Sequence, residues 1–382
     1  MFPYRAPAGV REPLYGVSCP GSHDCWAVGY ESPTNDAYTD ALVLHFDGRT
    51  WGAVDVPQLT SRNVLRAVGC LSAADCWAVG TSTQPDGDPL PLALHFDGTA
   101  WSSVPVPSPV VGFVAGEPSL DILTAVGCAT TSECFATGVR ARPGSPSAVT
   151  FVDQWDGSRW KAVGVPGLPA TPYPAPATAA TFPGLGVTCA SSSLCWMEGV
   201  MPNAFSATAP ENWPQRTLLF RWNGASWSYE PSSSDLWVAG CKGSGACWSA
   251  GVTPEPTGLV QTAMAFFDGT SWRLVASPQP GGTSADNVPS SVACATPADC
   301  WVTGFSYPPG PDPVQHATLF VIHLAGGHPT AANLLGASPD HQLDLSSSMA
   351  CASADLCFVV GSTYASGTAD YQPVILQGRR SA

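Results

Sequence analysis

The fourteen cysteines form seven pairs with a single spacing, and this regularity constrains the fold more than any other feature of the chain. Each pair is C-x5-C, and successive first cysteines lie 51, 58, 61, 52, 53 and 57 residues apart. A repeat of this period is typical of solenoids, propellers and other arrays. The pairs are Cys19/Cys25, Cys70/Cys76, Cys128/Cys134, Cys189/Cys195, Cys241/Cys247, Cys294/Cys300 and Cys351/Cys357.

Further positions repeat in register with the cysteines. An aromatic residue follows the second cysteine of each pair, and a glycine stands three residues beyond it, as Trp26 and Gly29 show in the first unit. Five units then carry the motif [DN]-G-x-x-W, which begins at Asp47, Asp97, Asp156, Asn223 and Asp268. The sixth unit departs from the motif at residues 325–327. The repeat therefore extends over almost the whole chain.

Each unit is predicted to form four short β-strands. In the first unit, residues 15–19 and 25–29 are β-rich runs around a polar turn, and residues 41–46 and 50–56 flank an Asp-Gly turn that is typical of a hairpin. Helical periodicity is absent, and only 12% of the residues are charged. The prediction is an all-β, seven-bladed β-propeller with four-stranded antiparallel blades, because a closed ring removes exposed sheet edges.

The two ends of the chain are predicted to complete one blade together. Unit seven has strands that end at Leu376 but lacks a fourth strand with its tryptophan. Tyr4–Pro7 matches the end of a fourth strand, because it aligns with Val54–Pro57. We expect the N-terminal strand to complete the last blade, so that residues 1–382 form a single seven-bladed domain.

The repeats C-x5-C-W-A-V-G and H-F-D-G-x-x-W resemble those of secreted β-propellers common in high-GC actinobacteria, and their hairpins are similar to kelch and sialidase-type (BNR) repeats. The resemblance covers the whole chain and implies the fold. It does not imply sialidase activity, because a sialidase Asp-box has one residue between Asp and Gly whereas Asp47 and Gly48 are adjacent. Propellers host lectins, hydrolases, lyases and scaffolds, so function has to be argued from the site.

The cysteine pairs have two interpretations, zinc sites or disulfides. A zinc site needs four ligands, and each unit offers one pair without a nearby histidine. Cysteines on neighbouring strands of a hairpin suit a cross-strand bond. We therefore predict one disulfide inside each blade, no metal and no cofactor. A fully paired set indicates an oxidising compartment, so the protein is predicted to be secreted although residues 1–12 lack the apolar core of a signal peptide.

Charge and motifs exclude several classes of function. The net charge of −14 argues against nucleic acid and anionic membranes as partners, because both attract a basic surface. No apolar run approaches the length of a membrane span. The motifs G-x-S-x-G and H-E-x-x-H, the phosphate-binding loop and the dinucleotide fingerprint are all missing. We expect a monomer whose partner is a glycan or a protein.

Residues that break the sevenfold pattern are the best candidates for a site, because repeated positions serve the ring. His45, His95 and His323 are equivalent and are interpreted as framework residues, as are the repeated tryptophans and the Asp of each turn. Four residues before each first cysteine, the inner strand enters from the face that carries the variable loops. The residues at this position are Tyr15, Arg66, Thr124, Leu185, Trp237, Ser290 and Ser347.

From these positions we predict that Tyr15, Arg66 and Trp237 bind a ligand at the mouth of the central channel, with Trp213 and Tyr307 as candidates in the loops. Glu198 is the one carboxylate at a position that is neutral in the other units, and a catalytic role is assigned to it only if the protein is an enzyme.

Three functions stay open at this point. The first is a secreted ligand-binding propeller, lectin-like or protein-binding. The alternative is a polysaccharide-active hydrolase or lyase, in which Glu198 would act with Asp121 or Asp40. The third is a structural role in an assembly.

Overall fold

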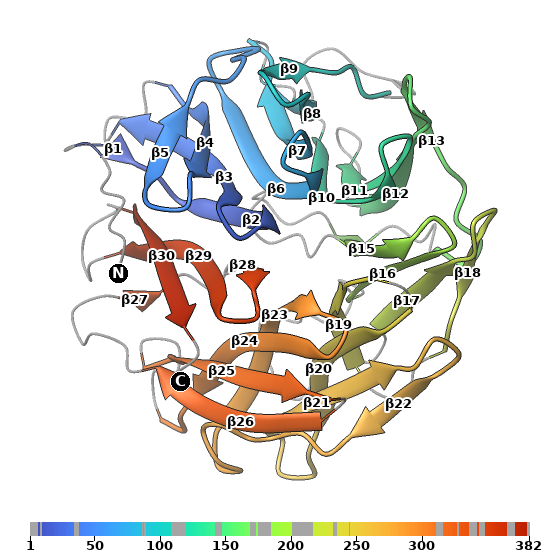
Figure 1. The fold of residues 1–382 in the computed structure, drawn as a ribbon, viewed down its shortest axis with the longest axis vertical. Helices are drawn as coiled ribbons and strands as arrows, with labels where there is room; N and C mark the ends of the chain where they lie inside the picture. The colour runs from blue at the N-terminus through green and yellow to red at the C-terminus, as the bar shows by residue number, and fades with distance from the viewer. Residues whose placement is uncertain are drawn as a thin grey trace.

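The computed structural model describes residues 7, 10–33, 38–85, 87, 89–107, 120–141, 147–168, 173–174, 185–200, 217–231, 235–243, 245–310, 316–326, 328–335, 342–343, 348–364 and 371–379. Seven antiparallel sheets stand around a central axis like the blades of a propeller (Figure 1). The described residues contain no helix, and therefore none that is long and apolar enough to cross a membrane. The predicted fold class, all-β with seven four-stranded blades, is confirmed.

Within a blade the strands follow each other from the channel outwards. The inner strands are β2 (Leu14–Gly21), β6 (Asn63–Ser72), β10 (Leu120–Thr130), β15 (Gly186–Ser191), β19 (Asp235–Cys241), β23 (Asp286–Thr296) and β28 (Ser348–Ser353). The second strands are β3 (Asp24–Pro33), β7 (Asp75–Thr83), β11 (Glu133–Ala141), β16 (Leu194–Val200), β20 (Cys247–Pro254), β24 (Asp299–Tyr307) and β29 (Leu356–Tyr364).

The outer half of each blade is a second hairpin. The third strands are β4 (Asp40–Phe46), β8 (Pro89–Phe96), β12 (Ser147–Trp155), β17 (Thr217–Trp222), β21 (Val260–Phe267), β25 (Thr318–Ala325) and β30 (Tyr371–Arg379). The outermost strands are β5 (Trp51–Val54), β9 (Trp101–Ser103), β13 (Trp160–Ala162), β18 (Trp227–Tyr229), β22 (Trp272–Val275) and β26 (His328–Leu335).

Three very short strands extend individual blades. β1 (Val10–Arg11) pairs with β3, β14 (Tyr173–Pro174) pairs with β12, and β27 (Gln342–Leu343) pairs with β29. Of the segment Tyr4–Pro7 only Pro7 is described, and it belongs to no strand. That this segment completes the seventh blade therefore stays a prediction.

Aromatic side chains hold neighbouring blades together. The tryptophan of [DN]-G-x-x-W packs edge-on against the aromatic residue that follows the second cysteine in the preceding blade, with ring centroids 5.2 Å apart for Trp26 and Trp101. The same contact closes the ring, because Phe358 of the seventh blade packs against Trp51 of the first at 5.3 Å. This geometry is the favourable one for aromatic pairs. The prediction that the repeated tryptophans form the core between blades is confirmed.

All seven C-x5-C pairs are disulfides, one in each blade, and no cysteine is free. The bonds are Cys19–Cys25, Cys70–Cys76, Cys128–Cys134, Cys189–Cys195, Cys241–Cys247, Cys294–Cys300 and Cys351–Cys357. Each bond joins the inner strand to the second strand, and in six blades the two cysteines stand directly opposite each other in the register. The predicted disulfides are confirmed and the zinc alternative is excluded, because no thiolate is left to bind a metal. The bonds indicate an oxidising environment.

The repeated polar residues also have framework roles. Nε2 of His45 lies 2.8 Å from Oδ1 of Asp24 in the same blade, and its ring stacks on Trp26 with centroids 4.2 Å apart. In the Asp-Gly turn, Oδ1 of Asp47 accepts hydrogen bonds from the backbone N–H groups of residues 49 and 50, and Gly48 has a φ of 93°. Glycine adopts this backbone conformation without steric cost. The framework interpretation of both residue types is confirmed.

Candidate functional site

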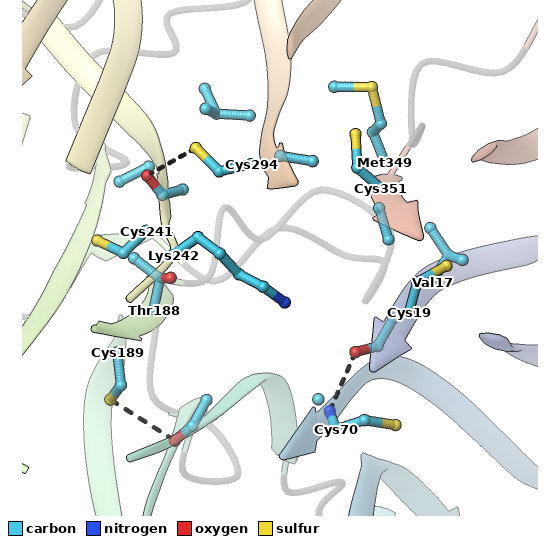
Figure 2. Close-up of a pocket in the computed structure, with 18 of the residues that line it drawn as sticks. Val17, Cys19, Cys70, Thr188, Cys189, Cys241, Lys242, Cys294, Met349 and Cys351 are labelled. Atoms are coloured by element: carbon cyan, nitrogen blue, oxygen red, sulfur yellow. Dashed lines mark hydrogen bonds between the residues drawn. The ribbon is translucent and has the colours of Figure 1, made fainter. Parts of the chain in front are cut away.

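The seven inner strands enclose a cavity of 410 Å³ on the axis of the propeller. Figure 2 shows this cavity with residues of six blades around it. The inner strand is the edge of its sheet, so much of the wall consists of backbone N–H and C=O groups. The cavity begins near Val17 and reaches the turns after the first cysteines, where Leu71 and Lys242 line it.

The two cysteines of a pair differ in their relation to this cavity, whereas the sequence analysis treated them alike. The first cysteine of every pair lines the cavity: Cys19, Cys70, Cys128, Cys189, Cys241, Cys294 and Cys351. The second cysteine of every pair is buried inside its blade and does not line it: Cys25, Cys76, Cys134, Cys195, Cys247, Cys300 and Cys357. The second cysteines are therefore core residues and offer a ligand no surface.

The position of the second cysteines has a simple physical reason. They stand on the second strand, which has a neighbouring strand on each side, so that their side chains pack into the hydrophobic cores on the faces of the sheet. Cys25 is fully buried there among Leu44 and Phe358. The first cysteines stand on the inner strand, where one edge faces the channel.

Lys242 is the only charged residue among the described residues that line the cavity, and its side chain extends over the opening (Figure 2). The sequence analysis missed this residue. The sequence does distinguish Lys242, because the position after the first cysteine is uncharged in the other six units. The equivalent residues are Pro20, Leu71, Ala129, Ala190, Ala295 and Ala352.

The opposite end of the channel is built from β-bulges. In β2 the pairing with β3 shifts between Leu14 and Gly16, so that Tyr15 is the extra residue. The same shift leaves Arg66 as the extra residue of β6 and Trp237 as that of β19. Bulges commonly turn a side chain away from its sheet near functional sites. The predicted position, four residues before the first cysteine, is therefore the extra residue of a β-bulge in these three blades.

The repeated glycine on the second strand makes this bulge sterically feasible. A Cβ atom added to Gly80 would overlap the backbone carbonyl of Val64, and one added to Gly29 would overlap that of Pro13. Any other residue would push the inner strand away. The glycine of C-W-A-V-G thus creates room for the bulge, and the bulge places the variable residue.

Tyr15, Tyr30 and Arg66 form a cluster between the first two blades. The guanidinium carbon of Arg66 lies 5.8 Å from the centroid of the Tyr15 ring, and the rings of Tyr15 and Tyr30 lie 6.1 Å apart. All three residues are half-buried. Burial lowers the pKa of Arg66, and the two phenols oppose this shift. The structure thus brings Tyr15 and Arg66 together, and the prediction that they bind a ligand with Trp237 at the mouth of the channel stays a prediction.

Tyr30 was not anticipated. It follows the repeated Gly29, and the equivalent residues are Thr81, Val139, Val200, Val252, Phe305 and Ser362. Tyr30 could have been recognised as a departure from the repeat, because the equivalent positions hold shorter or apolar residues.

The other ligand-binding candidates are distributed around the ring. The indole N–H of Trp237 donates to the carbonyl of Pro289 in the next blade at 3.1 Å, which fixes the ring beside the neighbouring inner strand. Tyr307 ends β24 opposite Asp286, and burial raises the pKa of its phenol. Trp213 lies outside the described residues.

Glu198 lies between the fourth and fifth blades, with only 2% of its surface exposed. Its Oε2 accepts a hydrogen bond of 3.0 Å from the Ser249 hydroxyl on β20. Burial raises the pKa of the carboxyl to about 8, and the hydrogen bond opposes the shift. A catalytic role for Glu198 stays a prediction, and the geometry places its carboxyl among core residues.

A second unusual carboxyl lies between the second and third blades. Asp153 is 1% exposed and occupies the third-strand position that holds Leu44 in the first blade. Burial raises its pKa to about 7. Nearby, Arg140 donates two hydrogen bonds of 2.9 and 3.0 Å to Asp121. Among the described residues, no group of three or more His, Cys, Asp or Glu side chains is arranged to hold a metal ion.

Comparison with known proteins shows the fold without a family. No family model matches the chain, and no curated protein is significantly similar to it. The resemblance to kelch and sialidase-type repeats therefore stays a prediction.

Similar solved structures include β-propellers. The β-propeller domain of the Trilobed protease from Pyrococcus furiosus, described as having an open velcro topology, is 6% identical over 100% of this chain and 97% of its own, with a TM-score of 0.52. A protein of unknown function from Dyadobacter fermentans is 9% identical over 98% of this chain and 100% of its own, with a TM-score of 0.50. A fucose-specific lectin from Aleuria aurantia is 12% identical over 87% of this chain and 97% of its own, with a TM-score of 0.42.

Proposed function

We propose that this protein is a secreted, lectin-like propeller that binds glycans at the channel mouth on the face of the variable loops. The observation that supports the proposal is the cluster of Tyr15, Tyr30 and Arg66, in which Tyr15 and Arg66 are the extra residues of β-bulges in two inner strands. Tyrosine offers a sugar an apolar ring and a polar hydroxyl together. A rigid scaffold with a few variable residues at one mouth is the usual arrangement of a binding site.

Secretion is part of the proposal, and it rests on the seven disulfides. A protein ligand is the other partner that the variable face suits. We favour a sugar, because the cluster consists of three side chains, whereas stable protein interfaces bury about 800 Å² on each partner.

A polysaccharide-active hydrolase or lyase is the alternative. Such an enzyme needs two carboxyl groups that a substrate touches, roughly 5–10 Å apart. Glu198 and Asp153 are the buried carboxyls with the largest upward pKa shifts among the described residues, and their 2% and 1% exposure leaves little surface for a substrate. This burial favours binding without turnover.

A glycan array combined with a polysaccharide depolymerisation screen tests the proposal on one preparation. We expect binding without new reducing ends, and a loss of roughly tenfold or more in affinity for Tyr15→Ala. Tyr229→Ala is the matched control, because Tyr229 is 47% exposed on the outermost strand β18.

Equal losses for Tyr15→Ala and Tyr229→Ala would place the site elsewhere, with Trp237, Tyr307 and Trp213 as the next residues to test. Turnover that disappears in Glu198→Gln would establish the enzymatic alternative instead.

A further inference from the structure

The guanidinium of Arg66 has no anionic partner in the described part of the chain. No carboxylate there forms a salt bridge with it, and its Nε atom is buried without a hydrogen bond. Its neighbours are the rings of Tyr15 and Tyr30. A positive charge removed from water without a partner costs free energy, which a bound anion recovers.

Two other arginines lie against aromatic rings, and only one of them has an anionic partner among the described residues. Arg140 forms a bidentate pair with Asp121 and also lies 4.3 Å from the centroid of the Phe151 ring. Arg221 replaces the framework histidine on the third strand, and its guanidinium lies over the core rings of Trp196 and Phe267. Arg66 differs from both in its position, because it is the extra residue of a β-bulge in the inner strand β6.

The arrangement suits a sugar that carries a carboxylate. A guanidinium offers two parallel N–H donors that match the two oxygens of a carboxylate, and this fork is more selective than a point charge. The Tyr15 ring beside it offers an apolar surface to the sugar ring that bears the carboxylate. In a chain with a net charge of −14, Arg66 is suited to a defined acidic group rather than to polyanions in general.

We propose that the ligand is an acidic glycan, and that Arg66 binds the carboxylate of a uronic acid residue while Tyr15 and Tyr30 contact its sugar ring. This assignment rests on the proposed glycan-binding function, and it names the class of sugar at the same site.

Matched pairs of oligosaccharides test the assignment. Galacturonate, glucuronate and mannuronate oligosaccharides are each compared with their methyl esters, which keep the ring and lose the negative charge. We expect the acid form of at least one pair to bind, and its methyl ester to bind roughly ten- to a hundredfold more weakly. Binding of the acid form weakens as the NaCl concentration is raised from about 20 to about 200 mM, because salt screens the charge pair.

Variants locate the interaction. Arg66→Met is expected to bind the acid form as weakly as the ester, and Arg66→Lys to lie between Arg66→Met and the unmodified protein, since it keeps the charge without the fork. Lys242→Met is the matched control, because it removes a cation from the opposite end of the inner strands. Lys242 is equivalent to Leu71, five residues after Arg66, which is on the order of 15 Å along a strand at about 3.3 Å per residue.

The outcomes separate the two proposals. Equal affinity for acid and ester, or binding of neutral glycans alone, overturns the acidic-glycan assignment and leaves glycan binding intact. Binding of no oligosaccharide in either form overturns glycan binding itself, and the assignment with it. The comparison of acid with ester uses the unmodified protein, so the result stands even where Arg66→Met does not fold.

Discussion

Replacing Glu198 by glutamine tests whether the carboxyl between the fourth and fifth blades is neutral in the folded protein. Glutamine keeps the size of the side chain and its oxygen can still accept the hydrogen bond from Ser249, but it has no ionised form. The substitution therefore removes a proton equilibrium while leaving the packing between the blades almost unchanged.

The expected magnitude follows from the two pKa values. The Glu198 carboxyl has a pKa of 4.5 when unperturbed and about 8 in the folded protein, so the folded state holds a proton that the unfolded state releases between these values. The contribution to stability is complete below about pH 4.5 and is lost as the pH rises to about 8. Since one pKa unit is worth about 1.4 kcal/mol, the total loss is roughly 5 kcal/mol.

Thermal unfolding from about pH 4.5 to about pH 8.5 measures this effect. We expect the midpoint temperatures of Glu198→Gln and the unmodified protein to agree near pH 4.5, and the variant to be higher by on the order of 5 °C at about pH 8. Asp153, with a pKa of about 7, titrates in both proteins, so the difference between them isolates Glu198. Glu255→Gln changes the same charge at an exposed turn and serves as the control.

A difference between variant and unmodified protein that is the same at every pH would refute the reasoning. It would mean that Glu198 is ionised between the blades, and that water or a further group reaches its carboxyl.

Three further predictions concern the framework. Gly80→Ala is expected to lower the midpoint temperature of unfolding by many degrees, because its Cβ would overlap the Val64 carbonyl. Gly52→Ala is the control and is expected to be nearly neutral, because a Cβ there has nothing within 4 Å. Equal changes in midpoint temperature for the two variants would contradict this prediction. Asp121→Asn leaves the Arg140 guanidinium without its ionised partner and is expected to cost about 3–5 kcal/mol in chemical unfolding, a loss that an unchanged midpoint would disprove. The non-reduced protein is expected to be lighter than the reduced chain by 14 hydrogens for its seven disulfides, and measurable free thiols would exclude full pairing.

Much of the fold was predictable because its determinants are local and repeated. A hairpin with a cysteine on each strand, a glycine and an Asp-Gly turn can be recognised within about fifty residues, and seven copies imply a ring. The framework role of His45 followed from the same repetition, because three equivalent histidines on separate blades cannot meet at one site.

The candidate site was only partly predictable. The sequence distinguished Tyr15, Arg66 and Trp237 as departures from the repeat, and their position proved to be a bulge. It did not indicate that Tyr30 joins Tyr15 and Arg66, because the cluster combines two strands of the first blade with the inner strand of the second, and no repeated motif records it. Lys242 was missed although it departs from six uncharged equivalents, because the cavity it lines exists only when the inner strands are assembled.

The sequence by itself determined the number of blades, the strand order within each blade and the disulfide pairing, because each of these depends on residues close together in the chain. The tertiary structure decided which side chains are enclosed and which face the channel, so that Cys19 lines the cavity while its partner Cys25 is buried. Glu198 is buried because Ser249 and the fifth blade cover it, and Arg66 lies beside Tyr15 because the first two blades bring their inner strands together. Burial and charge pairing depend on what the neighbouring blade brings into contact, and only closure of the ring brings those residues together.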